Sequence, residues 1–214
     1  MSGRVLQYTL VTDGSSDRVL TQIIDWTLRE SGVRADLRSV WADLRRLRKR
    51  PTGLEDRIRT AVKLYPCDLL FVHRDAEKLS RESRVQEINN AAIKVGVPRH
   101  VAVVPVKMQE SWLLCDERAI RVAAGNPNGA AKLQLPKRTA IERIADPKEK
   151  VFELLRTASG RQGRKLQRFN VEFARTQICE QMTDFSLLRA LPSFAAFEDA
   201  VRSTVKKHDF DPWP

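Results

Sequence analysis

Acidic side chains follow three apolar segments of the chain, close to the point where each segment gives way to polar residues. These acids are Asp13, Asp75, Glu77 and Glu110. Mg²⁺ is usually held by one or two carboxylates together with phosphate oxygens, and Mn²⁺ accepts similar ligands. A cation bound in this way polarises a phosphodiester and activates water. The acids therefore predict a metal-dependent phosphodiesterase site in which all four are catalytic, with Asp13, Asp75 and Glu77 as the metal ligands.

The stretch 68–77, Asp-Leu-Leu-Phe-Val-His-Arg-Asp-Ala-Glu, is the part of the chain on which this prediction depends most. Its four consecutive apolar residues favour a strand covered on both faces, as in parallel sheets. Ligands of open α/β sheets bind at the carboxyl ends of such strands. Residues two apart on an extended chain point the same way, so Asp75 and Glu77 would face one cation. The structural alternative is a strand-ending turn with solvated charges.

Strand and helix patterns alternate over the first 125 residues. Strand patterns cover 8–11, 37–41, 69–72 and 100–106, and helical spacing covers about 17–30, 54–64, 80–95 and 111–124. This alternation predicts the α/β class, with a mainly parallel Rossmann-like sheet layered by helices. Beyond residue 136 only helical patterns follow, near 139–144, 147–157, 171–182 and 193–205. We therefore expect an α/β catalytic domain over 1–130 and a helical extension over 131–214 packed on it.

The overall charge is strongly basic. The 214 residues include 38 Lys and Arg against 27 Asp and Glu, a net charge of +11. A surplus of this size predicts a polyanionic partner, with nucleic acid ahead of an anionic membrane surface. The three cysteines are far apart and odd in number, which favours reduced, buried thiols over disulfides or zinc ligands. We find no signal-peptide core and no apolar run of about 20 residues, so we expect a cytoplasmic protein without a membrane partner.

Two groups of basic residues are candidates for binding the nucleic-acid backbone. The first is Arg45, Arg46, Arg48, Lys49 and Arg50, and the second is Arg161, Arg164, Lys165 and Arg168 in a basic loop over 160–170. Like charges so close together repel, and a polyanion would relieve that repulsion, although a solvated face is the ordinary alternative. Phe169 beside the second group either stacks on a base or belongs to the core.

Three segments carry a resemblance to a known family. Asp13-Gly14-Ser15-Ser16-Asp17 resembles the first motif of Toprim domains, the metal-dependent catalytic domains of topoisomerases, primases and OLD-type nucleases. The segment 73–77 approximates their acid-x-acid motif. The segment 110–116, Glu-Ser-Trp-Leu-Leu-Cys-Asp, fits a small stand-alone Toprim-type bacterial family linked to phage defence. The resemblance covers roughly residues 6–125. It implies a Toprim-like sheet, a Mg²⁺-dependent (or Mn²⁺-dependent) nuclease for DNA or RNA, a role in anti-phage defence and an ATPase subunit as partner.

The sequence departs from the Toprim pattern at both acidic motifs. Asp13 stands where Toprim domains usually have Glu, and its carboxylate reaches about one methylene less far. In the second motif either His73 replaces the first acid and Asp75 is the second, or Asp75 and Glu77 are the pair. A catalytically degenerate module that binds nucleic acid or a partner ATPase is therefore the alternative function, and the oligomeric state is open.

Several candidates also have a purely structural interpretation. Asp17 is expected to interact with the first turn of a helix, and His73 to satisfy hydrogen bonds at the strand end, so both are secondary site residues. Glu77 is either a ligand or an exposed loop acid, and Glu110 either a site residue or the acid at a helix start.

Overall fold

The computed structural model describes residues 4–208, which belong to two compact units. Unit 1 contains the residues up to Val104 and those from Ala196 onward, and unit 2 contains Pro105–Ala195. The sequence analysis placed a single boundary near residue 130, whereas the chain divides after Val104 and again before Ala196. The physical reason is that the segment around 110–124 packs on later helices of unit 2, while Phe197 packs against Phe71 of the sheet.

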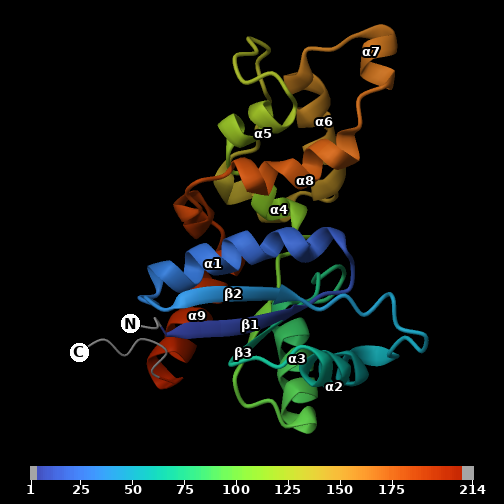
Figure 1. The fold of residues 1–214 in the computed structure, drawn as a ribbon. Coiled ribbons are helices and arrows are strands. Elements are labelled where there is room, and N and C mark those ends of the chain that lie inside the picture. Colours follow the sequence, from blue (N-terminus) through green and yellow to red (C-terminus); the bar gives the residue numbers. More distant parts are fainter. Residues whose placement is uncertain (1–3, 209–214) are drawn as a thin grey trace. The chain divides into compact units, whose positions relative to one another are not determined.

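Unit 1 is built on a sheet of four parallel strands, which confirms the predicted α/β class (Figure 1). The strands are β1 (Val5–Val11), β2 (Asp36–Trp41), β3 (Leu69–His73) and β4 (His100–Val103), in the spatial order β2-β1-β3-β4. All five residues of β3 are buried, as expected for a central strand that reads as a continuous apolar run. Val11 of β1 is in register with Val72 of β3, so these two strands end side by side.

One face of the sheet is covered by α1 (Leu20–Glu30) and by α9 (Pro192–His208), whose residues from Ala196 onward belong to unit 1. The aromatic side chains of this face identify both helices. Phe71 lies between Tyr8 and Phe197, with ring centroids 5.2 and 6.3 Å apart. The Tyr8 hydroxyl donates a 2.6 Å hydrogen bond to Asp25 of α1. A short 3-10 turn, η1 (Ser16–Val19), leads from β1 into α1.

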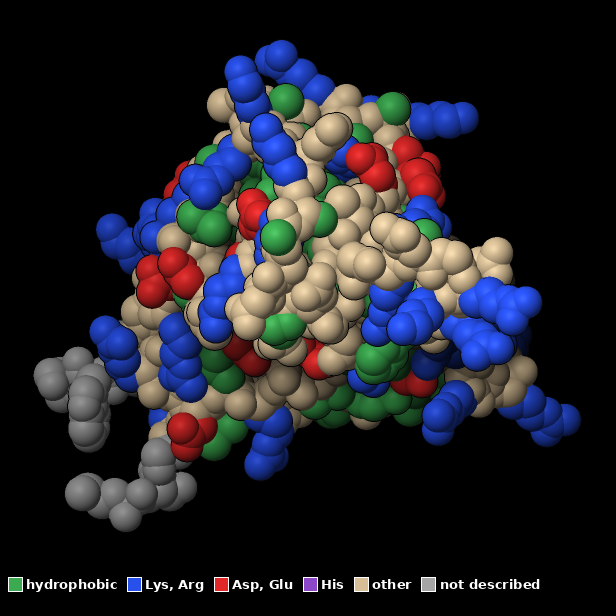
Figure 2. Space-filling model, turned by 90° about the horizontal axis from the view of Figure 1, so that it is seen from above, with side chains coloured by type: hydrophobic (Ala, Val, Ile, Leu, Met, Phe, Trp, Pro, Cys, Tyr) green, Lys and Arg blue, Asp and Glu red, His purple; other side chains and the backbone are tan. Residues whose placement is uncertain are grey.

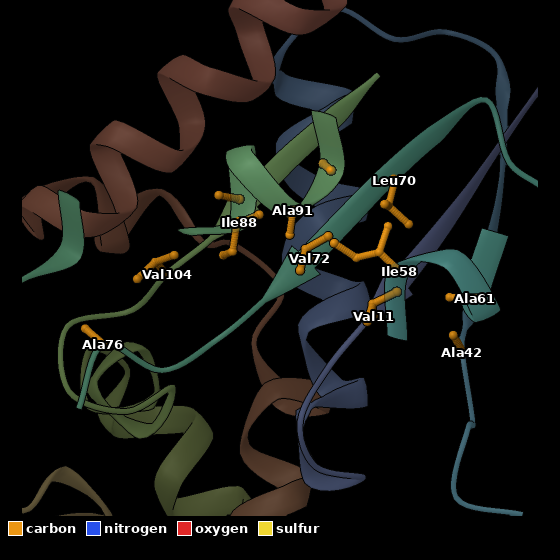
Figure 3. Close-up of a cluster of buried hydrophobic side chains, with 12 residues drawn as sticks. Val11, Ala42, Ile58, Ala61, Leu70, Val72, Ala76, Ile88, Ala91 and Val104 are labelled. Carbon is orange, nitrogen blue, oxygen red and sulfur yellow. The ribbon is translucent and has the colours of Figure 1, made fainter. Parts of the chain in front are cut away.

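The opposite face is covered by α2 (Gly53–Leu64) and α3 (Arg81–Val95). Figure 3 shows the side chains that hold this layer together: Ile58 of α2 and Ile88 of α3 lie against Val11, Leu70 and Val72 of the sheet. Each fully buried side chain of this size contributes about 1.5–3 kcal/mol of transfer free energy. Because helices pack on both faces, the carboxyl ends of β1 and β3 are held in fixed positions.

Unit 2 consists of helices. They are α4 (Glu110–Leu113), α5 (Glu117–Ala123), α6 (Pro147–Ser159), α7 (Gly163–Gln167) and α8 (Val171–Gln181), with 3-10 turns η2 (Arg138–Arg143) and η3 (Ser186–Ala190). Trp112 anchors the core of this unit: its ring contacts Phe194, and its indole N–H donates to Ser193 Oγ at 3.0 Å. None of the helices in residues 4–208 is long and apolar enough to cross a membrane.

Two details of the predicted secondary structure are wrong. The helix expected over 111–124 is two helices, because the chain turns after Leu113 and the Asp116 carboxylate caps α5 by accepting from Ala119 N at 2.9 Å. The basic segment 160–170, expected as a loop, contains α7. The helix expected from residue 80 begins at Arg81, and Ser80 caps it, since Ser80 Oγ accepts from Ser83 N at 3.1 Å.

Candidate functional site

The site lies at the carboxyl ends of β1 and β3, which are neighbours in the parallel sheet. The segment after β1 carries Asp13 and Asp17, and the segment after β3 carries Arg74 and Asp75. Although 61 positions separate them, Arg74 Nε donates to Asp13 Oδ2 at 3.1 Å. The two predicted acidic segments therefore meet at one edge of unit 1.

The segment 13–17 is folded around the carboxylate of Asp17. Asp17 Oδ2 accepts from Gly14 N, and Asp17 Oδ1 accepts from Ser16 Oγ, both at 2.9 Å. A Cβ on residue 14 would lie 3.3 Å from Asp17 Oδ2, so glycine lets the backbone approach the acid closely. Ser15, at the N-cap position of η1, makes no side-chain cap. Asp17 therefore organises this segment, and it is only 7% exposed.

His73 lies between the two segments and is 2% exposed. Its Nδ1 is 3.0 Å from the carbonyl oxygen of Val103. Because a carbonyl only accepts, Nδ1 carries the proton, and the neutral ring leaves Nε2 as an acceptor. Burial lowers the pKa of His73, although the negative charge of Asp17 opposes this shift, so the neutral ring is favoured.

Two carboxylates approach the same ring nitrogen. His73 Nε2 is 3.5 Å from Asp75 Oδ1 and 3.8 Å from Asp17 Oδ2. The neutral Nε2 and the two carboxylates are all acceptors, so a proton or a cation between them would lower their mutual repulsion. The three groups therefore form a candidate position for positive charge.

A chain of alternating charges runs beside this cluster. It consists of Arg57, Asp13, Arg74, Glu87, Arg84 and Glu77. Arg57 and Arg74 both pair with Asp13, Arg74 reaches Glu87 at 2.5 Å, and Arg84 reaches Glu87 at 2.7 Å. Most of these side chains are partly exposed, so each pair stabilises the fold by less than about 1 kcal/mol. Their main effect is to fix the direction of the arginines at the sheet edge.

Two predicted metal ligands belong to this chain of charges. Both carboxylate oxygens of Asp13 accept from arginines, Oδ1 from Arg57 and Oδ2 from Arg74. The Glu77 side chain is 69% exposed and lies 3.6 Å from Arg84, and its backbone has a left-handed φ of 52°. The acids that face His73 are instead Asp17 and Asp75. From sequence, Asp17 has the pattern of an acid at a helix start, which favours Asp13 as the ligand. The periodicity of the chain gives no sign of the arginines that pair with Asp13.

Glu110 belongs to unit 2, where it is 3% exposed. Its carboxylate pairs with Arg175 Nη1 at 2.5 Å. Burial raises the pKa of Glu110, although Arg175 acts in the opposite direction. Glu110 lies at the first residue of α4, which fits the helix-start interpretation of this acid.

The donor set determines which metal the site would accept. Within residues 4–208, no three His, Cys, Asp or Glu side chains are grouped so that they could hold one ion. Asp17 and Asp75 supply two carboxylates, and Mg²⁺ is often held by one or two carboxylates with water and phosphate completing the shell. The residues present therefore suit Mg²⁺ or Mn²⁺ bound together with a substrate phosphate, rather than a cage made of protein ligands alone.

A pocket of about 150 Å³ opens beside Asp13. We call it the arginine pocket, because Arg45, Arg50 and Arg57 line it together with Thr12, Asp13 and Trp41. Two of the five residues predicted from the first basic run, Arg45 and Arg50, are thus part of a concave site. The other three, Arg46, Arg48 and Lys49, are exposed on the same loop and do not line it.

The second basic group surrounds α7 in unit 2. Arg161, Arg164, Lys165 and Arg168 are all exposed. The Arg161 guanidinium lies 4.8 Å from the centroid of the half-buried Phe169 ring. Phe173, at the start of α8, is 61% exposed, which its apolar type gives no reason to expect. On the face drawn in Figure 2, Lys and Arg side chains project along much of the outline, with smaller groups of Asp and Glu between them.

Comparison of the chain with protein-family models, curated proteins and solved structures gave no match. The Toprim resemblance of 13–17 and 73–77 thus stays a prediction.

Proposed function

We propose that this protein is a Mg²⁺- or Mn²⁺-dependent phosphodiesterase that cleaves nucleic acid at the carboxyl edge of its parallel sheet, in the manner of Toprim nucleases. One observation carries the proposal: Asp17 and Asp75, from two different strand ends, both lie within 4 Å of His73 Nε2. Acids gathered at such an edge are where open α/β sheets bind their ligands. The net charge of +11 supports nucleic acid as the substrate class.

Each residue near the edge has a defined task in this proposal. Asp17 and Asp75 would hold the cation, and the anchored, buried ring of His73 would direct a neutral Nε2 toward the same place. Arg57 and Arg74, aligned by Asp13, present guanidinium groups to the phosphate. The bound cation would polarise the phosphodiester and lower the pKa of a coordinated water.

The assay is cleavage of labelled single- and double-stranded DNA and RNA with Mg²⁺, Mn²⁺ or EDTA. We expect cleavage that needs the metal, and a loss of about 100-fold or more in Asp75→Asn and in Asp17→Asn, because each removes a ligand. Asp36→Asn is the matched control, since Asp36 is an exposed acid at the start of β2, on the opposite edge of the sheet. It should retain full activity.

Thermal melting of each variant separates loss of chemistry from loss of fold. Asp75→Asn is the more informative variant, because Asp17 also organises the segment 13–17. If Asp75→Asn cleaves as fast as the unaltered protein, the proposed active site is wrong.

The pairing of Asp13 with two arginines favours a second function, binding without cleavage. Because both of its oxygens accept from arginines, the edge of the sheet presents basic groups where a catalytic acid was expected. A module that binds nucleic acid or a partner ATPase without cleaving would use the same basic edge. Such a module would bind with strong salt dependence and show no turnover with any divalent metal, so the same assay distinguishes the two functions. Either function would be compatible with a role in phage defence, which can be tested by comparing phage infection in cells with and without the protein.

A further inference from the structure

We propose that the arginine pocket is a phosphate subsite, which holds one phosphate group of the nucleic-acid strand beside the edge where Asp17 and Asp75 lie. The inference rests on the proposed function for the identity of the strand, and on the pocket itself for the phosphate. Its charge is the first argument. Three arginines line the pocket, of which Arg45 pairs with Asp43 and Arg57 pairs with Asp13, while Arg50 adds a further positive charge.

Asp13 does not neutralise the pocket, because it is shared with Arg74 as well as Arg57. Arg50 has no carboxylate partner within 4 Å in the described part of the chain, and its Nε donates to the Arg45 carbonyl at 3.1 Å. The pocket therefore holds positive charge that the protein itself leaves uncompensated. A guanidinium group matches two phosphate oxygens at once, which makes phosphate a better partner than a single-atom anion.

The arginines are already oriented. Arg45 forms two bonds to the Asp43 carboxylate, at 2.8 and 2.9 Å, and its guanidinium lies 4.9 Å from the centroid of the Trp41 ring. Trp41 is fixed in turn, because its Nε1 donates to Thr12 Oγ1 at 2.9 Å. Side chains that are held before binding lose less conformational entropy when a ligand arrives. Arg45 is therefore already held in position before a phosphate binds.

The size of the pocket limits which part of a nucleotide fits. Pockets for whole drug-sized molecules usually measure roughly 300–1,000 Å³. At about 150 Å³, the arginine pocket suits one phosphate group and not a complete nucleotide. That phosphate is either internal to the strand or at its end, and both share the same chemistry.

The test is binding of a 3′-labelled single-stranded oligonucleotide of about 12 nucleotides, within the range that single-strand binders cover. Fluorescence anisotropy in EDTA removes metal and cleavage from the measurement. Arg50→Gln should weaken binding about 10-fold, as expected for loss of a charged hydrogen bond. Arg48→Gln is the matched control from the same loop, outside the pocket, and should change binding less than about 2-fold.

Oligonucleotides with a 5′-phosphate and with a 5′-hydroxyl distinguish the two sources. If the pocket holds a terminal phosphate, the protein prefers the phosphorylated strand and Arg50→Gln abolishes the preference. If it holds an internal phosphate, Arg50→Gln weakens both strands equally. Equal effects of Arg50→Gln and Arg48→Gln, or no effect of either, would overturn the subsite. The binding assay contains no metal, so the two proposals can fail separately. If the protein binds strands in an Arg50-dependent way but cleaves none of them with Mg²⁺ or Mn²⁺, only the proposed function is wrong. If it cleaves strands but its affinity for them does not depend on Arg50, only the subsite is wrong.

Discussion

Glu110 and Arg175 show how a single pair of charges is placed inside unit 2. Their side chains are 4% and 9% exposed, and the pair is joined at 2.5 Å. Removing one partner of a buried pair leaves the other charge uncompensated, which costs about 3–5 kcal/mol. Arg175→Met should therefore destabilise the protein by this amount in chemical denaturation. Glu110→Gln combined with Arg175→Met should recover most of the loss, because no buried charge is left.

Arg156→Met is the matched control, since Arg156 forms an exposed pair with Glu149 in the same unit and its loss should cost less than about 1 kcal/mol.

The stability of Arg175→Met should also depend on pH, with a defined sign. Burial holds the folded-state pKa of Glu110 above its unfolded value, so the folded state binds the proton more tightly. In Arg175→Met, stability should rise as the pH falls through that raised pKa and decline again as the pH increases. Unchanged stability in Arg175→Met at neutral pH would contradict the role given to the pair.

The acids after β1 show what sequence can and cannot predict at the level of single residues. The apolar run that ends before Asp13 predicts correctly that acids follow the strand. It does not reveal that Arg57, from a helix 44 positions later, pairs with Asp13, or that Asp17 faces His73. Those contacts depend on where α2 and β3 lie in space, which no local pattern encodes.

At the scale of elements, the ends of α2 and α3 were predicted more accurately than the ends of the strands: each helix begins one residue from the expected position, whereas β1 begins at Val5 and not at residue 8. A continuous apolar run identified β3, because burial on both faces leaves a strong signal, whereas β2 has no such run and none of its residues is buried. β4 ends at Val103, earlier than expected, because Pro105 cannot donate a ladder hydrogen bond. The segment 111–124 was misjudged because Trp112 and Ile120 keep helical spacing across a break that Asp116 creates by capping α5.

Helix α7 carries a prediction of its own, since it concentrates exposed basic residues on one short element. If this element contacts nucleic acid, Arg164→Gln with Lys165→Gln should reduce the slope of log affinity against log salt by about 0.7–0.9 per residue. The matched control is Lys206→Gln with Lys207→Gln, two exposed basic residues near the end of α9. Equal slopes in the two double variants would show that α7 contributes only general charge.

At the scale of the whole molecule, the chain builds two units from one continuous sequence. It leaves unit 1 after β4, forms unit 2, and returns through α9, whose Phe197 packs against β3. A boundary read from the change in pattern near residue 130 misses this return, because α9 looks like any other helix of the second half. Composition predicted the polyanionic partner class, but only the fold separates Arg45 and Arg50 from their exposed neighbours.

The most direct measurement is a crystal structure of the protein soaked with Mn²⁺ and a short oligonucleotide, with anomalous scattering used to locate the ion. The account predicts one Mn²⁺ bound by oxygens of both Asp17 and Asp75 at about 2.0–2.2 Å, beside a phosphate of the strand. An ion bound elsewhere, or a bound strand with no ion near these two carboxylates, would contradict it.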